Sequence, residues 1–161
     1  MRRPKIYLET TLFNYYFDTD RDAHPATVAL FEEVAAGKYD AYTSTYVLDE
    51  LGAAPEPKRT NMLNLISRYE ISLLSENEET IRLANLYIKN GLIPEKYRTD
   101  GLHIAMAAVS DLDIIISLNF QHIVKRKTKL ETSALNALNG YRAVEILTPM
   151  EVVDYANYGH N

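Results

Sequence analysis

Two kinds of apolar stretch alternate along the chain. Short runs of aliphatic, β-branched and aromatic residues are typical of strands, and the longer stretches between them carry apolar residues at helical spacing. Residues 113–118 form the most apolar of the short runs, as expected for a strand inside a parallel sheet that is covered on both faces. The alternation predicts an α/β fold with helices on both faces of a parallel sheet. The predicted strands are residues 5–9, 40–44, 71–74, 113–118 and 144–147.

The helical stretches begin at capping residues and most of them end at glycine. Neither an internal repeat nor a domain linker is visible, so residues 1–161 are expected to form a single domain. Helices are expected from Thr10 or Thr11 to Phe17, from His24 to Gly37, from Thr45 to Gly52, over Lys58–Tyr69 and Asn77–Asn90, from Asp100 to Val109, through a small-residue stretch that ends at Asn139 and Gly140, and from Thr148 through Tyr155.

Composition limits the possible classes of protein. The 161 residues contain no cysteine, which excludes disulfides, zinc–thiolate sites and iron–sulfur clusters and agrees with a reducing cytoplasm. The first apolar run is short and broken by Glu9, so no signal peptide is expected. No stretch approaches the roughly 18 apolar residues of a membrane span. We therefore expect a cytoplasmic protein that does not enter a membrane.

The net charge of −5 argues against a protein that coats duplex DNA through bulk charge. It does not exclude a nuclease, because carboxylates that hold a cation make a chain acidic while the phosphate meets the cation.

Three carboxylates occupy places that a metal site in such a fold would use. Glu9 ends the first strand, Glu50 lies in the helix after the second strand, and Asp100 opens the apolar helix before the fourth strand. Strand ends and the helices that follow them share one edge of a parallel sheet, so Glu9 and Glu50 can face each other there. Asp100 joins them if the N-terminus of its helix points towards that edge.

Each acid also has a purely structural interpretation. Asp100 could be a helix N-cap, and Glu50 could be a solvated helix residue. Glu9 is harder to explain in this way, because a carboxylate at the end of a buried strand is costly unless it is paired, hydrogen-bonded or metal-bound. Asp49 points about 100° away from its neighbour Glu50 on a helix and is expected at the surface.

Clustered carboxylates favour Mg²⁺ or Mn²⁺, which are hard cations that prefer oxygen ligands. Such an ion can activate water and neutralise a scissile phosphate. Thr10 and Thr11 follow Glu9 directly and could orient a carboxylate or the water, or they could cap the helix.

The ordered set of these motifs resembles the PIN domain, the fold of the VapC-type toxin ribonucleases. The residues that carry the resemblance are Tyr7–Thr11, Val47–Leu51, Asp100–Ala105 and Ile115–Phe120. The resemblance implies a three-layer α/β/α sandwich around a mostly parallel sheet of four or five strands, and Mg²⁺- or Mn²⁺-dependent hydrolysis of RNA. It assigns the acidic positions of the family to Glu9, Glu50, Asp100 and, in fourth place, Asn119.

Two of these positions depart from the family pattern. Glu9 and Asn119 stand where the family most often has Asp. Glutamate keeps the charge but adds a methylene, whereas asparagine can accept a hydrogen bond but carries no charge. Metal affinity should therefore be lower than with four carboxylates, and a second metal becomes less favoured.

Several residues near the predicted site, Thr10 and Thr11 among them, could contact substrate or its phosphates. His122 lies three residues beyond Asn119, and Lys125 and Arg126 belong to a basic cluster that continues with Lys127 and Lys129. Solvated surface charge is the ordinary interpretation of such a cluster.

The leading hypothesis is thus a metal-dependent endoribonuclease of PIN type, the toxin of a toxin–antitoxin pair. Glu9, Glu50 and Asp100 would hold the metal and Asn119 would assist. The resemblance also implies an antitoxin protein as partner and a homodimer. A PIN-like module that binds RNA or protein without cleaving is the alternative, and Asn119 favours it. A carboxylate-site phosphatase is a third hypothesis, but the first strand offers no Asp nucleophile and no glycine-rich phosphate loop is visible.

Overall fold

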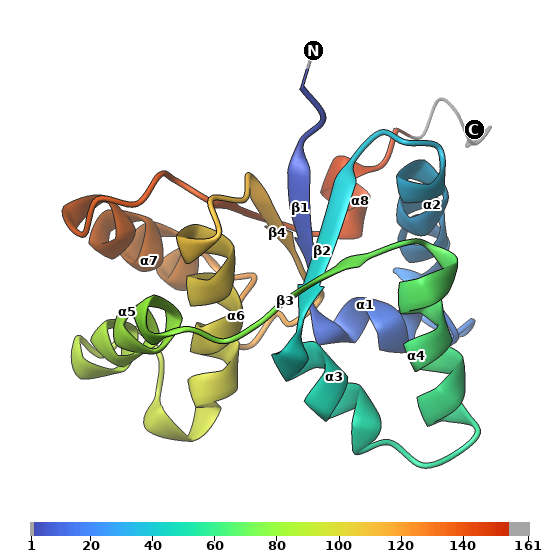
Figure 1. The fold of residues 1–161 in the computed structure, drawn as a ribbon, viewed down its shortest axis with the longest axis horizontal. Helices are drawn as coiled ribbons and strands as arrows, with labels where there is room; N and C mark the ends of the chain where they lie inside the picture. Colours follow the sequence, from blue (N-terminus) through green and yellow to red (C-terminus); the bar gives the residue numbers. More distant parts are fainter. Residues whose placement is uncertain (1, 155–161) are drawn as a thin grey trace.

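The computed structural model describes residues 2–154 of the chain and contains a five-stranded sheet, all of whose strand pairs are parallel. The strand order is β3-β2-β1-β4-β5, so the first strand lies in the middle (Figure 1). This arrangement confirms the predicted α/β class and parallel sheet. The strands are β1 (Lys5–Leu8), β2 (Asp40–Ser44), β3 (Ser72–Leu74), β4 (Ile114–Ile116) and β5 (Glu145–Leu147).

Helices cover both faces of the sheet, which confirms the predicted three-layer arrangement. In Figure 1, α5, α6 and α7 lie on one side of the sheet, and α1 to α4 with α8 lie on the other. The helices are α1 (Thr10–Tyr15), α2 (His24–Ala35), α3 (Thr45–Gly52), α4 (Lys58–Arg68), α5 (Glu78–Lys89), α6 (Arg98–Val109), α7 (Arg126–Leu138) and α8 (Pro149–Val152), with a 3-10 turn η1 (Glu95–Tyr97) before α6.

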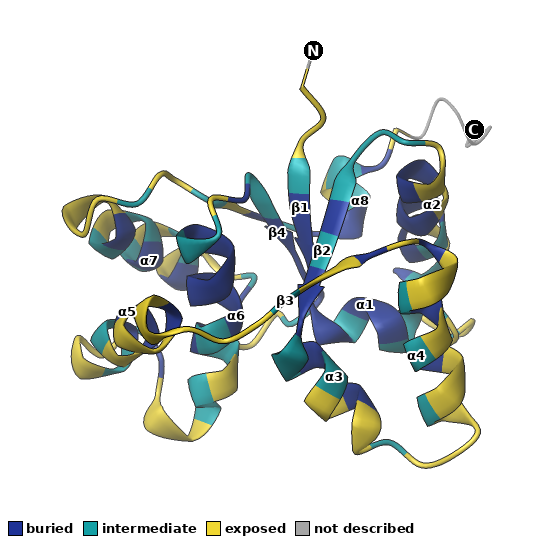
Figure 2. Cartoon of the chain, viewed as in Figure 1, coloured by how far each residue is buried: buried dark blue, intermediate teal, exposed yellow. Residues whose placement is uncertain are grey.

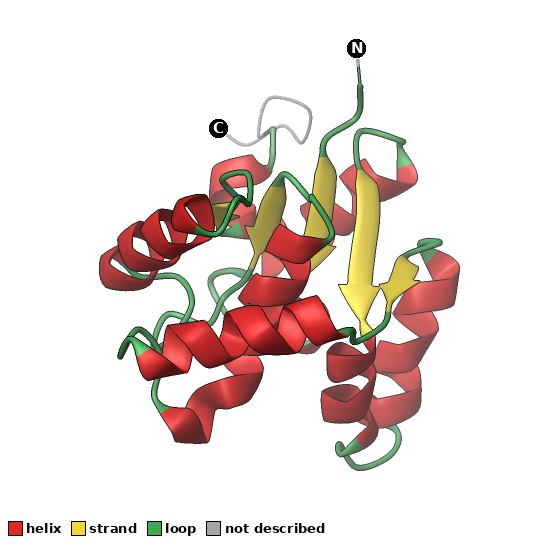
Figure 3. Ribbon diagram, turned by 60° about the vertical axis from the view of Figure 1, so that its left-hand side comes forward, coloured by secondary structure: helices red, strands yellow, loops and turns green. Residues whose placement is uncertain are grey.

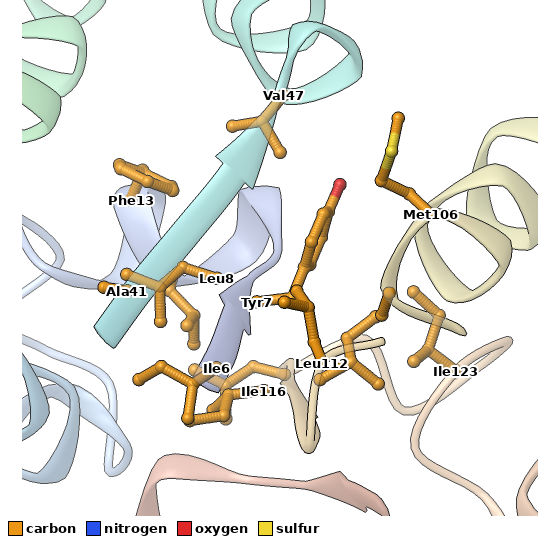
Figure 4. Packing of buried hydrophobic residues seen from close by; sticks show 14 of the residues in the cluster. Ile6, Tyr7, Leu8, Phe13, Ala41, Val47, Met106, Leu112, Ile116 and Ile123 are labelled. Atoms are coloured by element: carbon orange, nitrogen blue, oxygen red, sulfur yellow. The ribbon is translucent and has the colours of Figure 1, made fainter. Parts of the chain in front are cut away.

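The core is built around β1, whose apolar residues Ile6, Tyr7 and Leu8 are fully buried. Burial is concentrated on β1, β2 and β4 and on the inner faces of the helices, while β3 and the outer helix faces are largely exposed (Figure 2). Successive residues of a strand point to opposite faces of the sheet. Tyr7 leaves β1 on the side where Met106 of α6 lies (Figure 4). The side chains of β1 therefore pack towards the helices on both faces of the sheet.

The direction of α6 decides whether Asp100 can reach the carboxyl edge of the sheet. A short turn joins the end of α6 to β4, so the C-terminus of the helix lies at the amino edge of the sheet and its N-terminus at the carboxyl edge. All strands run in the same direction (Figure 3), so this edge is also where β1 and β2 end. The helix of Asp100 therefore begins at the edge where Glu9 and Glu50 lie, which is the arrangement that Asp100 needs to join them.

Several predicted element ends are wrong by a few residues. The helix expected to begin at Asp100 begins at Arg98, so Asp100 is not an N-cap. The N-cap of α1 is Glu9, whose carboxylate accepts a hydrogen bond from the Thr11 backbone, and not Thr10 or Thr11. The fourth strand covers Ile114–Ile116 and not residues 113–118, because the chain leaves the sheet after Ile116 and enters the loop that carries Asn119. Tyr155, predicted in the last helix, lies outside the described residues.

No helix within residues 2–154 is long and apolar enough to cross a membrane.

At the amino edge of the sheet, Asp113 joins the starts of two strands. Its Oδ2 accepts a hydrogen bond from the backbone nitrogen of Lys5 at 2.7 Å. Arg2 and Arg142 donate to the same carboxylate at 2.8–3.1 Å. The Arg2 guanidinium, the Lys5 amide and Arg142 together hold the pKa of Asp113 well below its usual range, although partial burial opposes them. The hydrogen bonds of Asp113 thus help to align β1 with β4.

We expect Asp113→Asn to lower the free energy of unfolding at neutral pH by about 1 kcal/mol, since the pairs with both arginines are screened by solvent. A carboxylate with a lowered native pKa contributes stability above its ordinary pKa of about 4, and this contribution is lost as pH falls below that value. Urea denaturation should therefore show a smaller loss of stability on acidification for the variant than for the wild type. Equal losses would contradict this role of Asp113.

Candidate active site

The carboxyl edge of the sheet brings together side chains from four segments of the chain. Glu9 follows β1 directly, Glu50 lies in α3 after β2, Asp100 lies in the first turn of α6, and Asn119 lies in the loop after β4. Asp49, beside Glu50, is exposed as expected. The predicted site residues therefore lie on neighbouring segments of one sheet edge.

Glu9 is almost fully buried, with 2% of its surface exposed. Its Oε1 accepts hydrogen bonds from the Thr11 backbone at 3.2 Å, from Thr11 Oγ1 at 2.5 Å and from Ser117 Oγ at 2.7 Å. Burial raises the pKa of Glu9, although nearby His103 and these hydrogen bonds partly oppose the effect. Thr11 Oγ1 also accepts from the backbone nitrogen of Leu118 and so joins the loop after β4 to Glu9.

Glu50 is held from two sides through the same oxygen. Its Oε1 accepts from Thr10 Oγ1 at 2.7 Å and from His103 Nε2 at 2.7 Å. Burial of the carboxylate favours its neutral form, but the bond and charge of His103 outweigh burial and lower the pKa of Glu50. Glu50 is thus held as a carboxylate at the edge of the site.

His103 is fully buried in α6 and lies under the influence of all three acids. Burial by itself lowers the pKa of His103, but its hydrogen bond to Glu50 and the charges of Glu9, Glu50 and Asp100 together raise it. The raised pKa favours the imidazolium, which donates to Glu50 from Nε2. A carboxylate cluster in a buried place needs positive charge nearby, and His103 supplies it from the protein itself.

The other ring nitrogen of His103 is joined to the sheet. Nδ1 lies 2.6 Å from the hydroxyl of Tyr7, which lies 2.6 Å from Ser44 Oγ at the end of β2. Burial raises the pKa of Tyr7 well above its usual value, so the phenol keeps its proton. With the imidazolium donating to the phenol oxygen, the phenol proton goes to Ser44. This series of hydrogen bonds fixes the position of His103 relative to β1 and β2.

Asn119 contacts Asp100 directly. Its Nδ2 donates to Asp100 Oδ1 at 3.2 Å, while its Oδ1 accepts from the backbone nitrogen of His122 at 3.1 Å. The backbone nitrogen of Asn119 donates to Ser117 Oγ at 3.0 Å, so Ser117 joins Asn119 to Glu9. Burial raises the pKa of Asp100, and the nearby histidines and Asn119 oppose that effect.

Of the predicted phosphate contacts, Thr10 and Thr11 donate hydrogen bonds to Glu50 and Glu9. The others, His122, Lys125 and Arg126, make no hydrogen bond to the three acids within residues 2–154. The ring of His122 stacks on Tyr97 at a centroid distance of 3.7 Å, and its Nε2 is buried with no hydrogen-bond partner in that part of the chain. Lys125 is the N-cap residue of α7 and Arg126 begins this helix, and both are exposed. Their role in binding phosphate stays a prediction.

The donor set suits a hard divalent cation, but the side chains are not arranged as a complete coordination shell. Glu9, Glu50 and Asp100 each use one oxygen for protein donors, and their second oxygens have no hydrogen-bond partner within residues 2–154. In that part of the chain, no group of three or more Asp, Glu or His side chains could hold one ion as it stands. Binding would therefore need movement of at least one carboxylate, and Glu50 would have to share its charge between His103 and the ion.

Sequence reasoning named His103 only as part of a motif and missed Ser117, Tyr7 and Ser44. The spacing of Asp100 and His103 on a helix places both on one face, which is a usable signal. Ser117 is a polar residue at the end of an aliphatic run, and such a residue is buried only with partners. Tyr7 and Ser44 offer no local signal, because their role depends on the pairing of separate segments.

Because the pKa of Glu9 is raised, the carboxylate should destabilise the protein at neutral pH when no cation is added. We expect Glu9→Gln to increase the free energy of unfolding above the ordinary carboxyl pKa of about 4 by about 0.5–2 kcal/mol, and to lose this advantage below it. Urea denaturation in EDTA at several pH values measures the difference.

Glu33→Gln is a matched control, because Glu33 is equally buried but has an ion pair with Lys38 at 3.7 Å and accepts from the backbone nitrogen of Asp154 at 2.9 Å. The control should lose stability. A loss for Glu9→Gln as well would show that the native contacts of Glu9 outweigh its burial.

Comparison with known proteins supports the fold. No family model and no curated protein matches the sequence. A solved structure matches, that of VapBC2 from Rickettsia felis bound to a DNA fragment from their promoter, with a TM-score of 0.52 and 18% sequence identity. The match covers 73% of this chain and 89% of that one. At this identity the likeness concerns the fold, and it confirms that the chain has the PIN-like fold that the motifs predict.

Proposed function

We propose that the protein is a metal-dependent ribonuclease that hydrolyses phosphodiester bonds of RNA. The observation that carries the proposal is the set of three carboxylates at one sheet edge, each held through one oxygen and left with a second oxygen that has no hydrogen-bond partner among residues 2–154. Oxygen ligands of this kind suit Mg²⁺ or Mn²⁺. The PIN-like fold adds support, since it is the fold of nucleases in the family that the motifs resemble.

In this proposal, Glu9, Glu50 and Asp100 hold the ion, and the other residues of the site keep those carboxylates in place. Thr11 and Ser117 fix one oxygen of Glu9, and Thr10 and His103 fix one oxygen of Glu50, so the second oxygen of each carboxylate would be the one to hold the ion. Asn119 steadies Asp100 without adding negative charge. When bound, the ion would activate water and neutralise the scissile phosphate.

The toxin hypothesis is a finer part of the same proposal. The matching structure is of VapBC2 with promoter DNA, which supports the proposal that this chain acts with an antitoxin protein. The homodimer is proposed from the family resemblance alone. Its RNA substrate implies a cytoplasmic location. The side chains of Lys125 and Arg126 are exposed and make no hydrogen bond or ion pair inside residues 2–154, so they are available for phosphate groups. Thr10, Thr11 and His122 are the other proposed contacts.

A second candidate function is an RNA- or protein-binding module with weak or no cleavage. Two observations favour it. Asn119 leaves the site with one charge fewer than four carboxylates would give, and His103 already pairs with Glu50. A site whose charge is partly balanced by its own histidine binds a cation less tightly.

RNA cleavage separates the two candidates. We expect the wild type to cleave single-stranded RNA with Mn²⁺ or Mg²⁺ and not in EDTA. Glu9→Gln and Asp100→Asn should each reduce the rate by at least about 100-fold, which is the upper end of the loss seen for residues that only orient metal ligands. Asp49→Asn is the matched control, because Asp49 is exposed, adjacent to Glu50 and outside the site.

The Asp49 variant should cleave at the wild-type rate. Cleavage that persists in EDTA or in both site variants would reject the metal site. Absence of cleavage with all metals, combined with retained RNA binding, would favour the binding module.

Asn119 gives an independent test of metal binding. We expect Asn119→Asp to bind Mn²⁺ about tenfold more tightly, or about 1.4 kcal/mol, because it adds a fourth carboxylate. In EDTA the same variant should be less stable, since it loses the Nδ2 donor to Asp100 and adds repulsion. Calorimetric titration with Mn²⁺ and thermal unfolding measure the two effects. Unchanged affinity would argue that Asn119 does not face the ion.

A further inference from the structure

A groove of about 460 Å³ is lined in part by Phe120, the residue that follows Asn119 of the candidate active site in the sequence, and the groove plays no part in the proposed chemistry. It is formed by the end of α1, the turn before α2, the loop after β4 and α8. Its apolar lining comes from Phe120, Tyr15, Ala23 and Met150, and its charged lining from Asp20, Arg21 and Asp22. A volume of this size lies in the range of ligand pockets.

Phe120 is the residue that joins this groove to the site. It follows Asn119 directly, and the Asn119 side chain contacts Asp100. Although Phe120 is aromatic, 54% of its surface is exposed. A single exposed apolar residue needs no explanation by itself. Here, however, Phe120 lines a groove and is the sequence neighbour of Asn119, whose side chain contacts Asp100.

We propose that this groove binds a nucleobase of single-stranded RNA, with Phe120 as the stacking platform. The inference rests on the proposed ribonuclease function and names the residue that would hold the strand beside the site. Aromatic side chains that are accessible on one face stack on bases of any sequence, because every base has a π-face. Phe120 has no hydrogen-bonding group, so the contact would not depend on base identity.

The charges of the groove favour a base over a phosphate. Asp20 and Asp22 make no hydrogen bond or ion pair within residues 2–154, and Arg21 is already engaged, with its Nε 3.1 Å from Asp18 and its guanidinium over the Tyr15 ring at 5.3 Å. Two unpaired carboxylates repel a phosphate, whereas the amino groups of a base can donate to them. The backbone would then remain outside the groove.

The same lining could instead attract a basic peptide, because a cation interacts favourably with aromatic faces and carboxylates. The position of Phe120 beside the site favours RNA, and the peptide is an outcome to be tested.

The test is binding of a fluorescent single-stranded RNA oligonucleotide to the full chain, measured by anisotropy in EDTA so that the proposed cleavage does not occur. We expect Phe120→Ala to weaken binding by about 5- to 150-fold, the range for loss of one base–aromatic stack. Phe120→Tyr keeps the ring and should bind as the wild type does. Leu130→Ala is the matched control, because Leu130 is a similarly exposed apolar residue, 58% accessible, on α7 and outside the groove.

Oligonucleotides with one abasic position identify the stacked base. At the position that enters the groove, removal of the base should weaken wild-type binding and leave Phe120→Ala binding almost unchanged, since the two changes remove the same contact. Thermal unfolding of each variant verifies that the fold is kept.

Two results would overturn the proposed base-stacking role of Phe120. Neither of them bears on the proposed ribonuclease activity, which the cleavage assay tests separately. One is equal RNA affinity for Phe120→Ala and the wild type. The other is Phe120-dependent binding of an arginine-rich peptide together with Phe120-independent binding of RNA. Failure of the wild type to bind RNA would also overturn it, and with no metal-dependent cleavage the proposed function would fail as well.

Discussion

The buried imidazole of His103 lies in the combined field of three carboxylates, and the geometry of the sheet edge depends on it. Glu9, Glu50 and Asp100 come from different segments and, as carboxylates, would repel one another at this edge, where Glu9 is buried and Glu50 is partly exposed. His103 balances part of this charge, and its link through Tyr7 to Ser44 ties the balance to β1 and β2. One side chain therefore joins the electrostatics of the site to the register of the central strands.

The regular secondary structure was predictable because it follows from local patterns of apolar and polar residues. The five strands, their parallel arrangement and the position of Glu9 at the end of β1 all follow from hydrophobic periodicity and strand order. The start of α6 was predicted two residues late, since Tyr97 is its N-cap and makes no side-chain capping bond. Helix ends depend on local geometry that residue preferences describe only in part.

The side-chain partners of the site were not predictable in the same way. Ser117 contacts Glu9 across 108 positions of the sequence, and His103 contacts Tyr7 across 96. Such pairs form only after the sheet has assembled, so no window of sequence contains both members. The sequence did predict that Glu9 and Glu50 share an edge, because parallel strands end at the same edge of a sheet, and that Asp100 joins them if its helix begins at that edge. It did not predict that one carboxylate would pair with a histidine.

The orientation of the helices around the sheet has a further electrostatic consequence. α3 follows β2 and α6 precedes β4, so both begin at the carboxyl edge, where the unpaired backbone amides of their first turns carry partial positive charge. This charge belongs to the peptide groups, so neither a change of pH nor loss of a bound ion removes it. The carboxyl edge of the sheet therefore keeps a permanent partial positive charge that comes from the backbone alone, and this charge favours the placement of several carboxylates there.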